Sequence, residues 1–274
     1  MRFEAFIPAA LLLSALSAPA LGQDAQAPQA PESATASGNT DVTALVKKAE
    51  SGDVTAQFTV GKMYDKGDGV EQNYAEALKW YGKAAEQGDN KALTNLGFMY
   101  ADGRGVKQNY ATAAKWYRKA ADKGDLVAQS NLAVLYAEGR GVKKNLAEAA
   151  KLYRAAAEQG SAHAQNKLGL MYAKGEGVKQ DDVEAVKWFR KSAEQGYAEG
   201  EHDLAVMYEE GRGIERDYAE AVKWYKRAGD QDYTYSLNNL GWLYASGKGV
   251  PKDRSEAVKF FKRAKEASVR ANMR

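Results

Sequence analysis

The chain has 274 residues, of which 45% are hydrophobic and 27% are charged, a balance typical of a folded protein rather than a disordered one. Its 39 basic and 36 acidic residues leave a net charge of +3, which provides no concentrated basic footprint for nucleic acid. There is no cysteine, so disulfides cannot stabilise the protein and a large apolar core must do so.

The N-terminus has the features of a secretory signal peptide, which we predict over residues 1–22. Arg2 gives a weakly basic start, an apolar run follows over 6–16, and small residues fit a cleavage site before Gln23 or, alternatively, before Leu21. The run is too short to span a bilayer comfortably, which disfavours an uncleaved anchor and stable membrane insertion. No cysteine follows it, which excludes a lipoprotein anchor. We therefore expect a periplasmic or secreted protein.

Two short segments precede the main body of the chain. Residues 23–40 are rich in Ala, Gln, Pro, Ser and Thr and lack an apolar period, which predicts a flexible tether. A short N-terminal capping helix is expected within 41–52, ending at Gly52 and covering the first repeat.

From residue 53 to residue 268 the sequence repeats every 36 residues without insertion. The clearest marker is a Gly-x-Gly element followed by Val or Ile, and its first glycines are Gly67, Gly103, Gly139, Gly175, Gly211 and Gly247. A fixed period of this length is typical of stacked supersecondary units. The predicted repeats are 53–88, 89–124, 125–160, 161–196, 197–232 and 233–268, with a C-terminal tail at 269–274. We predict an all-α fold, an α/α solenoid superhelix of six helix-turn-helix repeats.

The first helix of each repeat has start and stop signals. It begins after a capping side chain such as Asp53, although Tyr197 and Tyr233 replace that residue type in the last two repeats. It ends at the first glycine of Gly-x-Gly, because glycine readily adopts the left-handed conformation that closes a helix.

The second helix begins at a recurring Asn or Asp. A glutamate follows three residues later in five of the six repeats, as Glu76 follows Asn73, which is a capping-box arrangement. The helix usually closes at a glycine, but the fifth repeat has Asp232 there and Gly229 inside the helix. We therefore expect an irregularity over residues 229–233.

The repeated pattern resembles the Sel1-like repeat family, which is related to tetratricopeptide repeats. The shared elements are A-Q-x-x-L-G-x-[ML]-Y-x-x-G-x-G-V and then [ND]-Y-x-E-A-x-K-W-Y-x-K-A-A-E-Q-G, shown well by residues 128–160 apart from Leu152 at the Trp position. The resemblance covers 53–268 and implies a right-handed superhelix that acts as an adaptor or scaffold. Exported bacterial members are often signalling regulators or host-contact factors. One branch, with two cysteines per repeat, is linked to penicillin binding, and this cysteine-free chain departs from it.

The likeness to tetratricopeptide repeats also implies a concave groove lined by variable residues of each first helix, where an Asn bonds an extended peptide. The predicted partner-binding residues are Lys62, Asn95, Phe98, Asn131, His163, Lys167, His202, Asp203, Tyr235, Asn239 and Trp242. Phe98 and Trp242 are the favoured anchors, because other repeats place unrelated residues at their position. The tryptophans at a second, recurring position are expected in the core instead.

Other candidate sites have simpler explanations. No strand precedes the Gly-x-Gly loops and no Gly-Lys-Ser/Thr follows, so they are helix stops rather than phosphate cradles. His163 and His202 lack a third ligand and are interpreted as polar surface or groove residues, so we predict no metal and no cofactor. One lysine recurs in all six second helices, where we expect weak, solvated pairing with glutamate rather than a functional basic stripe. These lysines are Lys79, Lys115, Lys151, Lys187, Lys223 and Lys259.

No motif of a serine, cysteine or metal-dependent hydrolase is present, so we do not expect an enzyme. The predicted function is an exported protein–protein interaction scaffold or regulator. It would bind a protein or peptide, such as an envelope complex or a membrane sensor, through the concave groove. We expect a monomer with no nucleic-acid partner. The alternatives are a cell-wall or penicillin-type ligand-binding protein or hydrolase, and a glycan-binding solenoid, which the recurrence of most tyrosines at core positions disfavours.

Overall fold

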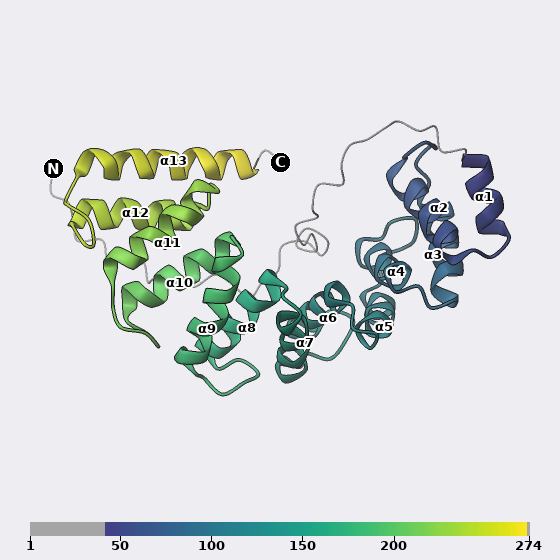
Figure 1. Cartoon of the computed structure of the whole chain (residues 1–274), viewed down its shortest axis with the longest axis horizontal. Helices are drawn as coiled ribbons and strands as arrows, with labels where there is room; N and C mark the ends of the chain where they lie inside the picture. Colours follow the sequence, from purple (N-terminus) through teal and green to yellow (C-terminus); the bar gives the residue numbers. More distant parts are fainter. Residues whose placement is uncertain (1–41, 273–274) are drawn as a thin grey trace. The chain divides into compact units, whose positions relative to one another are not determined.

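The computed structural model describes residues 42–272, so the predicted signal peptide and tether lie outside the described residues (Figure 1). The regular secondary structure of this part of the chain is entirely helical. Its elements are α1 (Val42–Glu50), α2 (Val54–Lys66), α3 (Tyr74–Glu86), α4 (Asn90–Asp102), α5 (Tyr110–Ala121), α6 (Leu126–Glu138), α7 (Leu146–Glu158), α8 (Ala162–Lys174), α9 (Asp182–Glu194), α10 (Ala198–Glu210), α11 (Tyr218–Asp230), α12 (Thr234–Ser246) and α13 (Arg254–Asn272). The predicted all-α solenoid of helix-turn-helix repeats is confirmed. No helix between residues 42 and 272 combines the length and apolar character needed to cross a bilayer.

The helices form two compact units, which are described separately. Residues 42–159 hold α1 to α7, and residues 160–272 hold α8 to α13. Within each unit an even-numbered helix pairs with the odd-numbered helix after it, and that helix packs against the next even-numbered one. Helix α1 covers α2, as the sequence predicts for a leading helix.

The helix ends follow the predicted caps, but the glutamate half of the predicted capping box is not formed. The N–H of Asn73 donates to the carbonyl of Tyr64 at 2.9 Å, and Glu76 pairs with Lys79 instead. The Asn73 side chain accepts hydrogen bonds from the backbone N–H groups of Ala75 and Glu76 at the start of α3. Tyr197 and Tyr233 make no side-chain cap, as their residue type predicts. The closing glycines of the even-numbered helices have left-handed backbones; these are Gly67, Gly103, Gly139, Gly175, Gly211 and Gly247.

A glycine in the first helix allows close contact within a repeat. A Cβ added at Gly61 would lie 2.7 Å from Cδ1 of Tyr81, so the aromatic ring rests directly against the backbone of α2. Tyr81 is fully buried as a result. The recurring aromatic residue of the second helix is therefore a core residue that ties its two helices together.

The loop of one repeat contacts the second helix of the repeat before it. A Cβ added at Gly105 would lie 2.8 Å from the carbonyl carbon of Tyr74, at the start of α3. Gly69 is the matching glycine of the first repeat. Among the described residues, an added Cβ there would meet only side-chain atoms of Met63 and Val42, at 3.4 and 3.7 Å. The second glycine of Gly-x-Gly is thus a junction residue as well as a turn residue.

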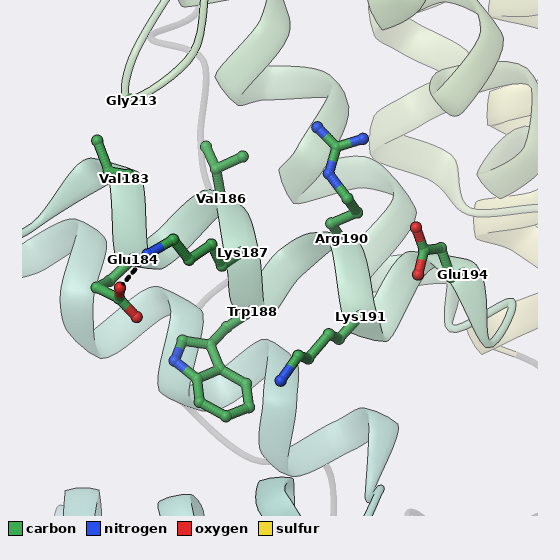
Figure 2. A pocket seen from close by; sticks show the side chains of 9 residues that line it. All are labelled: Val183, Glu184, Val186, Lys187, Trp188, Arg190, Lys191, Glu194 and Gly213. Atoms are coloured by element: carbon green, nitrogen blue, oxygen red, sulfur yellow. Dashed lines mark hydrogen bonds and ion pairs between the residues drawn. The ribbon is translucent and has the colours of Figure 1, made fainter.

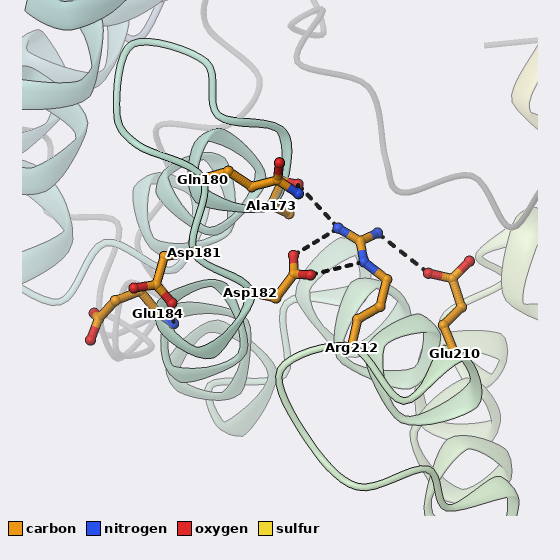
Figure 3. A network of polar contacts seen from close by, with 7 residues as sticks. All are labelled: Ala173, Gln180, Asp181, Asp182, Glu184, Glu210 and Arg212. Carbon is orange, nitrogen blue, oxygen red and sulfur yellow. Dashed lines mark hydrogen bonds and ion pairs between the residues drawn. The ribbon is translucent and has the colours of Figure 1, made fainter.

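An arginine strengthens one of these junctions (Figure 3). The Arg212 guanidinium donates to both carboxylate oxygens of Asp182, at 2.7 and 3.2 Å, and to the carbonyl of Ala173 at 3.0 Å. It also bonds Glu210 at 3.3 Å. The hydrogen bond to Asp182 is the largest cause of a raised Arg212 pKa. Because Asp182 and Ala173 belong to the preceding repeat, Arg212 fastens the loop to it.

The expected irregularity at 229–233 is confined to one residue. Helix α11 runs through Gly229 to Asp230 without a break. Asp232 then adopts φ 61°, the only positive φ of a non-glycine residue in the described range. Its carboxylate accepts hydrogen bonds from Arg263 at 3.2 Å and Arg270 at 2.8 Å, both on α13.

Candidate functional site

In the unit of residues 42–159, the predicted groove residues lie on α2, α4 and α6. Lys62 is exposed, whereas Asn95 and Phe98 are half-buried. Asn131 is buried and donates to the carbonyl of Val127 one turn earlier, at 2.8 Å. The predicted groove residues of this unit therefore range from exposed to buried, a difference that helical periodicity alone did not indicate.

The asparagine position lies beside a buried tyrosine of the preceding repeat. Burial is the largest cause of the raised pKa of Tyr81, and Asn95 of the next repeat opposes that increase. Tyr225 and Asn239 are related in the same way, and the pKa of Tyr225 is again raised mainly by burial. Among the described residues the buried Tyr81 hydroxyl has no hydrogen-bond partner, whereas the Tyr225 hydroxyl donates to Glu209 at 2.9 Å.

The two favoured aromatic anchors share one local geometry. The Phe98 ring meets Tyr117 edge to face, with centroids 5.6 Å apart. Trp242 meets Phe261 in the same way at 5.5 Å. The underlying ring of the same repeat orients each anchor. They differ in access, because Phe98 is half-buried and Trp242 is 56% exposed.

In the unit of residues 160–272, four of the predicted residues are buried: His163, Lys167, His202 and Asp203. Burial, and secondarily the charge of Lys167, lowers the pKa of His163 to about 3. Nδ1 of His202 lies 2.9 Å from the Ser236 hydroxyl. Asp203 accepts a hydrogen bond from Asn166 at 2.8 Å. The interpretation of the histidines as surface or groove residues did not anticipate this depth.

The sixth repeat presents the most accessible part of the predicted site. Tyr235 is 57% exposed and Trp242 is 56% exposed. Their spacing of seven residues places them on the same face of α12, with the half-buried Asn239 between them. Tyr235 also lies 5.7 Å from the ring of Tyr233. Together, Tyr235, Asn239 and Trp242 form what we call the α12 face.

The recurring lysines and tryptophans lie on the second helices, as predicted. Lys79 pairs with Glu76 at 3.2 Å and remains largely exposed, which is the weak solvated pairing expected. Trp80 and Trp188 are buried, while Trp116 and Trp224 are half-buried. These tryptophans are therefore mainly structural.

A pocket on α9 was not predicted from the sequence. It is an open depression of about 420 Å³ beside Trp188 (Figure 2). The Nζ atom of Lys191 lies over the Trp188 ring, 4.3 Å from its centroid. Its remaining lining residues are Val183, Glu184, Val186, Lys187, Arg190, Glu194 and Gly213. Val183 is the one sequence signal, because four other repeats have alanine at its position. Within residues 42–272, no group of three His, Cys, Asp or Glu side chains is arranged to hold a metal ion.

Comparisons with known proteins agree on the architecture. The sequence model of the Sel1 repeat matches residues 54–89, 90–125, 126–161, 162–197, 198–233 and 234–269. A Sel1 repeat protein from Oxalobacter formigenes is 34% identical, with a TM-score of 0.71 over 82% of this chain and 96% of that one. A protective antigen of uropathogenic Escherichia coli with an SLR fold is 40% identical, with a TM-score of 0.80 over 82% of this chain. This chain covers 48% of the length of that antigen. No curated protein matches the sequence.

Proposed function

We propose that this chain, which belongs to the Sel1 repeat family, is an exported interaction scaffold that binds a protein or peptide partner through its first helices. Sel1 repeats are commonly protein-interaction scaffolds and are generally non-catalytic. Export is proposed from the signal-like sequence of residues 1–22. Binding through the even-numbered helices is proposed from the variation of their side chains, since solenoids use extended surfaces for recognition.

The observation that carries this proposal is the exposed aromatic pair of the α12 face. Most large aromatic side chains of the described repeats are buried or half-buried, but Tyr235 and Trp242 are each more than half exposed. Exposed Tyr and Trp beside a hydrogen-bonding group are typical energetic centres of protein interfaces. The fold does not require Trp242, because the same position holds Lys, Phe, Val or Leu in the other repeats.

Site-specific crosslinking tests this surface while also capturing the partner. A photoreactive phenylalanine analogue replaces Tyr235 in one variant and the exposed Lys115 of α5 in a control, both expressed in the native cell. A discrete adduct that forms from position 235 and not from 115 is expected. Adducts from position 115 alone would show that the outer face binds instead.

Affinity measurements with the captured partner then test the anchor. Trp242→Ala should weaken binding by about 10- to 100-fold, equivalent to roughly 1–3 kcal/mol, because an exposed aromatic anchor is lost. Helicity should be unchanged, since the ring is 56% exposed. Lys115→Ala is the control and should bind as the wild type does. Turnover of a cell-wall substrate by the purified chain would contradict the scaffold proposal.

A further inference from the structure

One face of the last helix has a composition that differs from every earlier repeat. Six residues of α13 lie on it, which we call the C-terminal stripe: Arg254, Val258, Phe261, Lys262, Lys265 and Val269. Their spacings of three, four, seven and eight residues place them along one side of a helix. Val258 is 65% exposed, Val269 is 51% exposed, and the Lys262 side chain is 77% exposed.

In earlier repeats the matching face is covered by the next repeat. Where the successor lies in the same unit, three of the four positions equivalent to Val258 are buried: Ala114 at 5%, Val186 at 6% and Val222 at 4% exposure. The fourth, Leu78, is half-buried. The ring equivalent to Phe261 is likewise fully buried, as in Tyr81 and Tyr225, whereas Phe261 is only half-buried. The C-terminal stripe is therefore a stacking surface without its usual cover among the described helices.

The polar positions of the stripe also correspond to contacts between repeats. The residue equivalent to Lys262 is Arg118 in the second repeat, which donates to the Tyr136 hydroxyl and to Glu148 of the third repeat, both at 3.0 Å. In the fourth repeat Arg190 donates to the Tyr208 hydroxyl at 2.9 Å. A cation at this place thus normally meets hydroxyl and carboxylate oxygens of the element stacked upon it.

The charge of the stripe indicates what would cover it. Arg254 stands where the fourth repeat has Asp182 and the other earlier repeats have Tyr or Leu, and Lys265 occupies the position of Ala193. Together with Lys262 these residues give the stripe three cations. One acid lies beside it, because Glu266 is 3.9 Å from Lys262. At the equivalent Gly229 an added Cβ would lie 3.0 Å from the Leu237 side chain of the next repeat, so another repeat of the usual kind would press an apolar side chain against Lys265. A second copy of the chain would meet like charges at either end, since Lys47 and Lys48 close α1.

We propose that the C-terminal stripe docks an acidic amphipathic α-helix of a partner protein, at a surface separate from the α12 face. A helix fits because helices cover this face in the earlier repeats and pack side chains into the grooves between ridges. Helix α10 is a helix of this kind within the chain. It packs on the equivalent face of α9, where its Tyr208 hydroxyl accepts a hydrogen bond from Arg190 at 2.9 Å. It carries five acidic residues, Glu199, Glu201, Asp203, Glu209 and Glu210. In the folded chain, Glu201, Asp203, Glu209 and Glu210 bond residues outside α9, and in an isolated peptide these carboxylates would be available to the cations of the stripe.

The test uses a peptide with the α10 sequence of residues 198–210, stapled to hold it helical and labelled with fluorescein. Anisotropy titration with the full-length protein should give saturable binding that weakens with added salt, because three cations contribute. Val258→Glu should weaken binding at least tenfold. Lys262→Glu should weaken it and reduce its salt dependence.

A matched variant separates this surface from general effects. Val183 is similarly exposed, at 53%, but lies on α9 rather than α13, so Val183→Glu should bind the peptide as the wild type does. An absence of saturable binding, or an equal loss in Val183→Glu and Val258→Glu, would overturn the proposal. A wild-type dimer in sedimentation equilibrium that Val258→Glu converts to monomer would also overturn it, because the occupant would then be a second copy.

Discussion

The junction glycines allow a matched test of repeat stacking. Gly69 and Gly105 occupy the same loop position, with φ values of 71° and 70°. Alanine at either residue should cost about 1–2 kcal/mol, because a side chain in the left-handed region meets its own backbone. Each substitution also lowers the conformational entropy of the unfolded chain by a similar amount. The backbone strain and this entropy change therefore cancel when the two variants are compared.

The variants differ in what the new methyl group meets. At Gly105 it would lie 2.8 Å from the carbonyl carbon and from Cβ of Tyr74, and 2.9 Å from the carbonyl oxygen, so backbone must move. Overpacking of this kind costs about 1–3 kcal/mol. At Gly69 the nearest atom among the described residues is the flexible end of Met63 at 3.4 Å, which is ordinary contact. Gly105→Ala should therefore be less stable than Gly69→Ala by about 1–3 kcal/mol.

Urea unfolding followed by circular dichroism measures this difference. With an m value of about 2 kcal/mol/M, a difference of 2 kcal/mol separates the two midpoints by about 1 M. The m values should agree, because neither substitution changes the extent of the folded surface. Equal midpoints for the two variants would refute the reasoning, since backbone strain alone would then explain both glycines.

Three further predictions concern the fold. Arg212→Gln should lower the free energy of unfolding by about 1–2 kcal/mol in urea titration, because the junction loses its charged hydrogen bonds to Asp182. Burial is the largest cause of the raised pKa of Glu209. The protonated carboxyl therefore contributes a stabilisation that is fully present below the usual pKa of 4.5. That stabilisation is lost as the pH rises through the pKa of the folded state. Glu209→Gln should therefore stabilise the protein more at pH 7 than at pH 4, and an equal effect at both would contradict this. Deletion of residues 125–160 should leave a cooperatively folded, shorter protein, whereas deletion of 125–142 should not, as circular dichroism and urea melts would show.

The sequence predicted most of the fold because its main signals are local. An Asn or Asp followed by Glu specifies a helix start, and a glycine specifies its end, within a few residues of one another. Features that depend on contacts between residues far apart in the sequence were not predicted. Gly105 and Tyr74 are 31 residues apart, so the junction role of the second glycine is visible only in three dimensions. Asp232 likewise gave a break signal, but pairing with α13 accommodates it.

The candidate site was less predictable than the fold. Helical period identifies the face on which a side chain lies, but it does not give the depth of that side chain. Lys62 and Lys167 share one face of the first helices, yet Lys62 is exposed and Lys167 is only 3% exposed. The pocket beside Trp188 depends on the three-dimensional shape of the surface. Its only signal in the sequence is Val183, which replaces the usual alanine. The C-terminal stripe, by contrast, becomes recognisable once the burial of equivalent positions is compared.

The carboxylate of Asp232 has a consequence for the order in which the protein opens. It bonds Arg263 and Arg270, which lie seven residues apart, and so fastens α13 at two points about two turns apart. Helix α13 also buries Ala257, Ala264 and Ala267, whereas α1 buries a single alanine. Terminal elements of a repeat array open first, since each has only one neighbour. Of these two described helices, α1 should therefore exchange its amide hydrogens faster than α13.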